Sequence, residues 1–242
     1  MDAITKLLNV ALSEVGYLEK ASNKNLESKT ANAGKNNFTK YANFFDTKYP
    51  DFYNGKKNGY PWCDIWTDWV FVTAFGVDLA MKMLGQPPRS LGAGCTFSAQ
   101  YYKQMCAFYS QPKKGDQIFF KDENGNVCHT GLVYDVDSNY VYTVEGNTSS
   151  SAGVVANGGS VEKKKYKRTF SRIYGYGRPD YSLYKEEKQI PKLDNTPDAY
   201  AKDAVKWAKE KGIIKGDENG NLMLHSNITR QDMLVFLYRL HK

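Results

Sequence analysis

The sequence has few residues of the kinds that build metal centres and disulfide frameworks. Its 242 residues include four cysteines and three histidines. Because the cysteines form no Cys-x-x-Cys pair, we expect no structural zinc site. The chain also lacks a long apolar run, which excludes a transmembrane helix. A hydrophobic content of 41%, with 20 Gly and 8 Pro, is close to average globular usage and excludes collagen-like and disordered chains.

The N-terminal residues do not have the pattern of a secretory signal. Residues 1–20 place apolar side chains at helical spacing, and polar residues such as Asn9 and Glu14 interrupt them. A signal peptide needs a continuous apolar stretch followed by small residues at the cleavage site, and neither is found there. We therefore expect an amphipathic helix at 4–18 and, for work outside a cell, an export route that uses no signal peptide.

The charge balance is basic, with 33 Lys and Arg against 26 Asp and Glu and a net charge of +7. This suits an anionic partner, such as a polyanionic wall polymer, a membrane surface or a nucleic acid. The densest basic run, residues 163–168, is interpreted as the solvated face of a strand or hairpin. Nucleic-acid binding has only the net charge in its favour, and we expect none.

The hydrophobic period changes along the first 180 residues. Helical patterns come first and strand patterns follow, with turn signals between the strands. This order predicts an α+β domain over 1–180 with an antiparallel meander. The expected helices cover 4–18, 63–75 and 98–108, and the expected strands cover 117–121, 128–136, 140–145 and 161–166.

A charged segment with two prolines, 181–197, predicts a linker. An all-α module over 198–242 follows it, with one helix over 198–211 and a second that begins near Thr229. A unit of about 45 residues in two helices has a marginal core. We therefore expect this module to dock, to repeat or to oligomerise.

Cys63 is the cysteine with the most distinctive surroundings. Gly59 and Pro61 precede it and an apolar helical run follows it, so the thiol is expected at a helix N-terminus. There the free N–H groups and the helix dipole stabilise a thiolate. Most free cysteines are small buried hydrophobic residues, but this position favours a reactive one.

A nucleophilic cysteine needs a base and an acceptor that orients the base. His129 is the one histidine of residues 1–180, and it lies in the expected strand 128–136. A hairpin with the next strand pairs residues whose numbers sum to about 276, which places His129 opposite Asn147 and Glu145 near Gly131. Glu145 and Asn147 then share a face. Separately, His129 could be a core histidine and Glu145 a surface charge; together with Cys63 they favour a catalytic site.

The other cysteines are interpreted as structural. Cys128 precedes His129 on the same strand, and neighbouring side chains on a strand point to opposite faces. Cys95 and Cys106 have no basic neighbour in the sequence.

Five motifs occur in one order, and together they resemble the CHAP domain, a family of papain-like cysteine peptidoglycan hydrolases common in phage endolysins and bacterial autolysins. The motifs are Trp62-Cys63-Asp64, Gly115-Asp116-Gln117-Ile118-Phe119-Phe120, His129-Thr130-Gly131-Leu132-Val133-Tyr134, Val144-Glu145-Gly146-Asn147 and Gly175-Tyr176-Gly177-Arg178-Pro179. The resemblance covers most of residues 1–181 and implies a papain-like fold.

The resemblance also implies a role for each residue. Cys63 would be the nucleophile, His129 the general base and then acid, Glu145 the residue that orients the imidazole, and Asn147 a further polar member of the site. The Cys63 N–H would supply one oxyanion donor, and the second would come from Tyr60 or Asn58. The aromatic residues expected to bind substrate are Tyr60, Trp62 and Trp66.

The C-terminal module resembles an S-layer-homology module. The pair Trp207-Ala208 lies on the expected helix over 198–211. It is followed by Gly-Ile-Ile-Lys-Gly at 212–216 and by Ile-Thr-Arg-Gln-Asp at 228–232, where the family usually has Ala-Glu in the last two positions. The family implies binding of a secondary cell-wall polysaccharide, with Trp207 and Arg230 as contacts. Such modules commonly come in threes, so a single one is expected to form a homo-oligomer or to bind weakly. The alternative to wall binding is that the module is a small helical unit that packs against the enzyme domain.

These expectations combine into a bacteriolytic, endolysin-like hydrolase of Gram-positive peptidoglycan. The bond would be an amide of the stem peptide, cut by an N-acetylmuramoyl-L-alanine amidase or an endopeptidase. No cofactor and no metal are expected, because Asp46 and Asp51 are too sparse for the calcium loop of some CHAP domains. The protein would be made in the bacterial cytoplasm, without stable membrane association, and would reach the wall after holin-type release. The alternatives are a non-catalytic wall-binding protein with an inactive CHAP-like domain and a papain-like protease of protein substrates.

Overall fold

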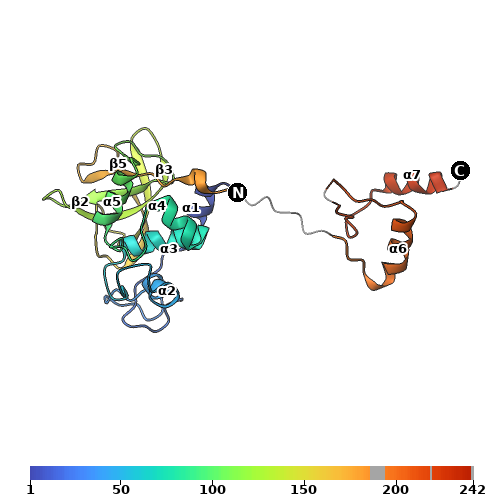
Figure 1. Ribbon diagram of the computed structural model, residues 1–242. Coiled ribbons are helices and arrows are strands. Elements are labelled where there is room, and N and C mark those ends of the chain that lie inside the picture. Colours follow the sequence, from blue (N-terminus) through green and yellow to red (C-terminus); the bar gives the residue numbers. More distant parts are fainter. Residues whose placement is uncertain (186–193, 219, 241–242) are drawn as a thin grey trace. The chain divides into compact units, whose positions relative to one another are not determined.

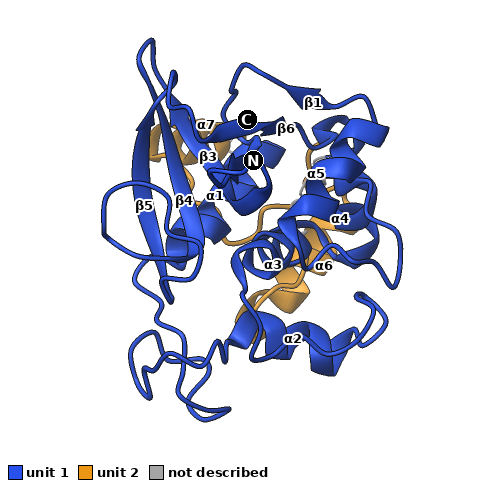
Figure 2. Cartoon of the chain, turned by 90° about the vertical axis from the view of Figure 1, so that its left-hand side faces the viewer, with its two compact units in different colours: residues 1–186 blue, residues 187–242 orange. Residues whose placement is uncertain are grey.

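The computed structural model describes residues 1–185, 194–218 and 220–240. They belong to two compact units, Met1–Glu186 and Glu187–Lys242 (Figures 1 and 2). Among the described residues, none of the helices combines the length and the apolar character that crossing a membrane requires.

The first unit begins with helices whose N-termini are capped by polar side chains. Asp2 caps α1 by accepting a hydrogen bond from the Thr5 N–H at 3.0 Å. Thr39 caps α2 in the same way. These caps satisfy N–H groups that a first helical turn leaves free. The helices of this unit are α1 (Ala3–Ser13), α2 (Lys40–Lys48), α3 (Cys63–Phe75), α4 (Val77–Leu84), α5 (Cys95–Gln104) and the short 3₁₀ helix η1 (Tyr181–Leu183).

An antiparallel sheet of six strands follows the main helices, in the order β1-β6-β2-β3-β4-β5. Strands β3 and β4, which carry the expected base and its orienting residue, are interior strands with a neighbour on each side. The strands are β1 (Phe108–Tyr109), β2 (Gln117–Lys121), β3 (Val127–Val136), β4 (Tyr140–Thr148), β5 (Ser160–Lys167) and β6 (Ile173–Gly177).

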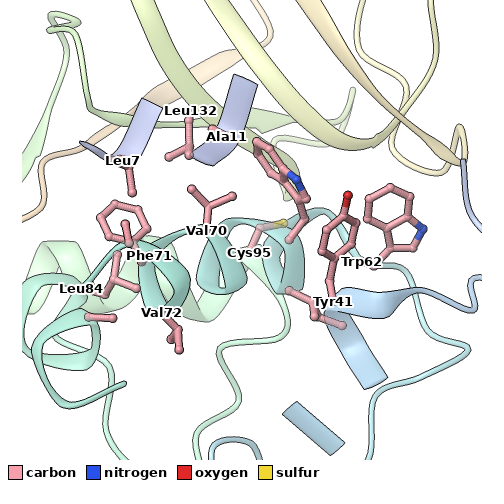
Figure 3. Packing of buried hydrophobic residues seen from close by; sticks show 14 of the residues in the cluster. Leu7, Ala11, Tyr41, Trp62, Val70, Phe71, Val72, Leu84, Cys95 and Leu132 are labelled. Carbon is pink, nitrogen blue, oxygen red and sulfur yellow. The ribbon is translucent and has the colours of Figure 1, made fainter. Parts of the chain in front are cut away.

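Helix α3 forms the centre of the first unit. It packs against helices α1, α2 and α4 and against strands β3 and β4, so its side chains are buried nearly all around. Figure 3 shows Leu7 of α1 and Leu132 of β3 close to Val70 and Phe71 of α3. This two-sided packing fixes the start of α3 against the strands that carry the other site residues.

The α+β prediction is confirmed, and the four expected strands correspond to β2, β3, β4 and β5. The first helix is shorter than expected because Gly16, with φ of 87°, turns the chain after α1. The helix expected at 98–108 begins earlier, at Cys95, and ends at Gln104, since Cys106 has φ of 54°. The basic run 163–168 lies mostly on β5, at the edge of the sheet.

The second unit is small and helical, with η2 (Ala199–Ala201), α6 (Lys202–Glu210) and α7 (Arg230–Leu240). Thr229 accepts a hydrogen bond from the Asp232 N–H at 3.0 Å, as an N-cap does, and its hydroxyl donates to the Asp232 carboxylate, a variant of the capping box. The apolar side chains of α6 and α7 are largely exposed, among them Leu234 at 67% and Trp207 at 52%.

Residues 186–193 of the predicted linker 181–197 lie outside the described residues, and its first residues belong to the first unit. The ring of Tyr181 stacks on Phe71 at 6.4 Å, and its hydroxyl donates to the Gly115 carbonyl at 2.6 Å. The predicted linker start at 181 is therefore too early. Tyr181 stands beside a charged segment that contains prolines, and no local sequence pattern there predicts its contacts with Phe71 and Gly115.

Candidate active site

Cys63 is the first residue of α3, as the sequence predicts. The preceding residue, Trp62, has non-helical backbone angles, and its carbonyl accepts the first helical hydrogen bond, from the Trp66 N–H at 2.9 Å. The Cys63 side chain is 7% exposed. Its thiol thus lies where free N–H groups and the helix dipole favour negative charge.

His129 and Glu145 meet across β3 and β4. The register pairs Leu132 with Val144 and Val133 with Thr143, which confirms the predicted sum of 276 in this part of the hairpin. A Cβ atom added to Gly131 would overlap the Glu145 side chain, so the glycine makes room for it. His129 Nε2 lies 3.0 Å from Glu145 Oε2, and both side chains are fully buried.

The Glu145 carboxylate is held by two further donors. The Thr143 hydroxyl donates to Oε1 at 2.5 Å, and the Tyr166 hydroxyl lies 3.3 Å from Oε2. A buried carboxylate needs such partners to remain ionised. The three contacts fix Glu145 as the acceptor that sets the orientation of the imidazole ring.

The second ring nitrogen of His129 is left for the thiol. Among the described residues, Nδ1 is buried and has no hydrogen-bond partner. Since Glu145 occupies Nε2, Nδ1 is the nitrogen able to exchange a proton with the neighbouring Cys63 side chain. The interaction between the thiol and the ring changes the pKa of Cys63 and the pKa of His129. This is the geometry of a thiol, a base and an orienting acid.

The site favours the charged pair of thiolate and imidazolium. A hydrogen bond from Cys95 contributes most to lowering the pKa of the Cys63 thiol, and His129 and the Asp64 N–H act in the same direction, so the pKa falls well below its usual range despite burial. Burial opposes protonation of His129, but the adjacent Cys63 and Glu145 raise its pKa to about 9. Both groups are therefore charged near neutral pH.

Cys95 is the residue of this site that the sequence analysis missed. It was interpreted as structural, but it begins α5 and its thiol interacts with that of Cys63. The interaction with Cys63 and, after it, burial raise the pKa of Cys95, so it stays protonated. The available signal was its position after Gly94 at the start of a helical pattern, as with Cys63 and its preceding turn.

Asn147 does not join the group as expected. Its side-chain N–H donates to Asn157 Oδ1 at 3.0 Å, and its Oδ1 accepts from the Gly159 N–H at 3.2 Å. Asn147 has φ of 54°, and the pairing of β4 with β5 is irregular between Glu145 and Thr148. The alternation that would place Asn147 on the same face as Glu145 is therefore broken, and its amide orders the 147–159 loop.

Two of the three expected substrate contacts are core residues. Trp62 is fully buried and its indole N–H donates to Glu19 Oε2 at 2.9 Å. Trp66 is also fully buried and packs so closely on Gly146 that a Cβ there would overlap it. Neither ring is available to a substrate, because both lie in the core of the first unit. Tyr60, by contrast, is 61% exposed.

The side chain of Asn58, one of the two candidate oxyanion donors, is used in the fold. Its Oδ1 accepts from the Thr39 N–H at 3.0 Å, and its N–H donates to Asn23 Oδ1. Tyr60 is therefore the candidate that is left free. All four cysteines are free thiols, and among the described residues no group of three or more metal-ligating side chains gathers.

The expected wall contacts lie in the second unit, which is described by itself. Trp207 is on α6 and is 52% exposed, and Arg230 is the exposed first residue of α7.

Comparison with solved structures finds five matching chains, among them two of Ly7917. The crystal structure of Ly7917 gives a TM-score of 0.43 at 11% identity, covering 74% of this chain and 62% of that chain. The crystal structure of Ly7917 with the hydrolyzing product of MDP gives 0.41 at 12% identity, covering 73% and 62%. This chain thus spans less than two thirds of the length of either match. A comparison with curated proteins finds no match.

Comparison with family models assigns both parts of the chain. Residues 55–147 match the CHAP domain, a range that includes the thiol, the histidine and the buried glutamate, and residues 193–234 match the S-layer homology domain. The CHAP match thus lies within the first unit and the S-layer homology match within the second.

Proposed function

We propose that the protein is a cysteine peptidoglycan hydrolase that cleaves an amide bond of the stem peptide. The observation that carries this proposal is the arrangement of Cys63, His129 and Glu145: a thiol at a helix start, beside a histidine with one ring nitrogen bound to a buried carboxylate and the other left unpartnered. The CHAP match supports peptidoglycan as the substrate.

In the first half of the reaction, the Cys63 thiolate attacks the carbonyl carbon of the amide. A carbon–sulfur bond forms and the carbonyl electrons move onto oxygen, where the Cys63 N–H at the start of α3 donates a hydrogen bond. The His129 imidazolium then gives its Nδ1 proton to the amide nitrogen as the carbon–nitrogen bond breaks. The amine leaves, and a thioester to Cys63 is left.

In the second half, water replaces the amine. Neutral His129 takes a proton from the water, and the resulting hydroxide attacks the thioester carbon. The carbon–sulfur bond breaks with its electrons returning to Cys63, which restores the thiolate and the imidazolium and releases the carboxylic acid. Glu145 accepts the hydrogen bond from His129 Nε2 and stabilises the imidazolium.

The same chemistry serves an N-acetylmuramoyl-L-alanine amidase and an endopeptidase of the stem or cross-bridge, since both bonds are amides. Tyr60, exposed and three positions before the nucleophile, is proposed as the aromatic substrate contact and as the second oxyanion donor.

For the second unit, we propose binding of a secondary cell-wall polysaccharide with Trp207 and Arg230 as contacts. The S-layer homology match supports this, as does the exposure of both residues. We further propose that the unit associates with other copies, because the apolar side chains of α7 are exposed: Leu234 at 67% and Phe236 at 46%.

The test compares wild type with Cys63→Ala on purified Gram-positive sacculi, following turbidity and the masses of released fragments. We expect clearing by wild type alone and pelleting of both proteins with the walls; the fragment masses then separate amidase from endopeptidase. Absence of clearing by wild type, with both proteins on the walls, would favour a wall-binding protein instead. Cleavage of casein without action on sacculi would favour a protease.

A further inference from the structure

A buried polar contact lies behind the site and joins its two main elements. Gln117, on β2, is 1% exposed. Its Nε2 donates to Asp64 Oδ1 at 3.0 Å and to Thr130 Oγ1 at 3.1 Å. Asp64 directly follows Cys63, and Thr130 directly follows His129. One amide group therefore joins the residue after the nucleophile to the residue after the base.

The contact has one defined hydrogen-bond pattern. The Tyr102 hydroxyl donates to Gln117 Oε1 at 3.0 Å, which fixes which end of the amide faces Asp64. Thr130 cannot donate to Gln117, because its hydroxyl donates to the Ile118 carbonyl at 2.7 Å. With the amide reversed, the Tyr102 hydroxyl would face an N–H group in place of the oxygen to which it donates.

The second oxygen of Asp64 also has a donor. The Ser98 hydroxyl, on α5, donates to Asp64 Oδ2 at 2.6 Å. Asp64 itself is fully buried. A buried carboxylate without its donors is costly, so Asp64 stays where both donors reach it. The first turn of α3 is thereby tied to β2 and β3 at a point next to Cys63.

We infer that Gln117 is a positioning residue: its amide sets the first turn of α3 against β3 so that the Cys63 sulfur faces His129. The inference rests on the proposed function, because it assigns Gln117 to the same thiol chemistry. It adds a residue that touches neither the sulfur nor the imidazole.

The experiment measures the reactivity of the Cys63 thiol in the full chain. The rate of alkylation by iodoacetamide is followed against pH, and peptide mass spectrometry resolves each cysteine, with exposed Cys106 as the reference within the same molecule. This readout needs no peptidoglycan. It therefore separates a failure of the positioning role from a failure of the hydrolase proposal, which kcat and KM on sacculi test independently.

Gln117→Glu keeps the shape of the side chain but replaces the donor by an acceptor. We expect Cys63 alkylation at pH 7 to slow about tenfold, because the two buried hydrogen bonds that the amide donates, to Asp64 and to Thr130, are lost. A double variant, Asp64→Asn with Gln117→Glu, places the donor on residue 64 and the acceptor on residue 117; we call it the exchanged pair. It should return the alkylation rate to within about threefold of wild type. On sacculi, the single variant should lower kcat and leave KM unchanged.

Two further variants separate positioning from stability. Thr130→Val removes the β3 end of the contact, together with the hydrogen bond from Thr130 to the Ile118 carbonyl, and should slow alkylation of Cys63. Tyr53→Phe removes an equally buried hydrogen bond, 2.7 Å long, from Asp68 on the same helix. It does not reach Gln117, so the reactivity of Cys63 should stay at the wild-type value while the melting temperature falls.

The inference is wrong if Gln117→Glu and Thr130→Val react with iodoacetamide as wild type does over the whole pH range. It is also wrong if the exchanged pair folds but stays as slow as Gln117→Glu, or if Tyr53→Phe slows Cys63 equally. Should Gln117→Glu fail to fold, Thr130→Val decides by the same criterion.

Discussion

Replacing Glu145 by glutamine removes the charge beside His129 and keeps the shape of the side chain. In the folded protein, Glu145 Oε2 accepts from His129 Nε2 at 3.0 Å, and Oε1 accepts from the Thr143 hydroxyl. A glutamine oxygen can still accept from the ring, and the new N–H can donate to the threonine hydroxyl once that hydroxyl rotates. The substitution therefore tests the charge rather than the packing.

The expected loss follows from the burial of the pair, since both side chains are fully buried. A hydrogen bond to a charged group contributes about 1.5–3 kcal/mol, and a fully buried pair belongs near the upper part of that range. At about 1.4 kcal/mol for each factor of ten, Glu145→Gln should lower kcat about 30- to 150-fold. The loss comes from a less stable imidazolium and, with it, a less stable thiolate.

The pH–activity profile shows the direction in which Glu145→Gln should change the pKa of His129. Activity rises with pH as Cys63 loses its proton, and it falls as His129 loses its proton, near pH 9 because the pKa of His129 is raised to about 9. Without the Glu145 charge the pKa of His129 falls, so the alkaline limb moves to lower pH. The active range therefore narrows from its alkaline side.

The assay is the rate of sacculus clearing between pH 5 and pH 10, with the alkylation rate of Cys63 as a second readout. Glu162→Gln is the matched control, since Glu162 is the register partner of Glu145 on β5 and has no contact with the site cysteine or histidine among the described hydrogen bonds. The reasoning is refuted if Glu145→Gln keeps the wild-type kcat and an unmoved alkaline limb.

Two other substitutions test the surroundings of the same group. Cys95→Ala removes the donor that contributes most to lowering the pKa of Cys63, so the alkylation midpoint of Cys63 should move to higher pH, with Cys128→Ala as the control; identical profiles for both variants would contradict this role. Gly131→Ala adds a methyl group that overlaps Glu145. It should lower both kcat and stability, by about 1–3 kcal/mol in chemical denaturation, and a fully active, equally stable variant would show that the carboxylate has room to move.

The parts of the site that the sequence predicted are those set by local patterns. The turn before Cys63 and the apolar run after it place the thiol at a helix start, and α3 begins there. Likewise, a hairpin has a fixed register. Pairing residues whose numbers sum to about 276 therefore predicted that Glu145 lies next to Gly131. Both inferences use neighbours in sequence or one turn geometry, and neither needs the tertiary fold.

The parts that were wrong depend on tertiary packing. The register is irregular after Glu145, and the Asn147 side chain therefore does not lie on the same face as Glu145. Counting residues from the hairpin turn cannot predict such a bulge. Trp62 precedes α3 and Trp66 lies on it, and both rings are fully buried; from the sequence alone, a core ring cannot be distinguished from a substrate contact. The approach of Cys95 to Cys63 joins two helix starts that are far apart in the chain.

The central claim is that Cys63 becomes covalently acylated by the stem peptide. The most direct measurement is acid quenching of wild type during turnover on soluble sacculus fragments, followed by mass spectrometry of its cysteine peptides. The account predicts an added mass equal to the acyl fragment on the peptide that contains Cys63 and on no other cysteine peptide. Continued product release from Cys63→Ala, with the Cys63 peptide of wild type unmodified, would contradict it.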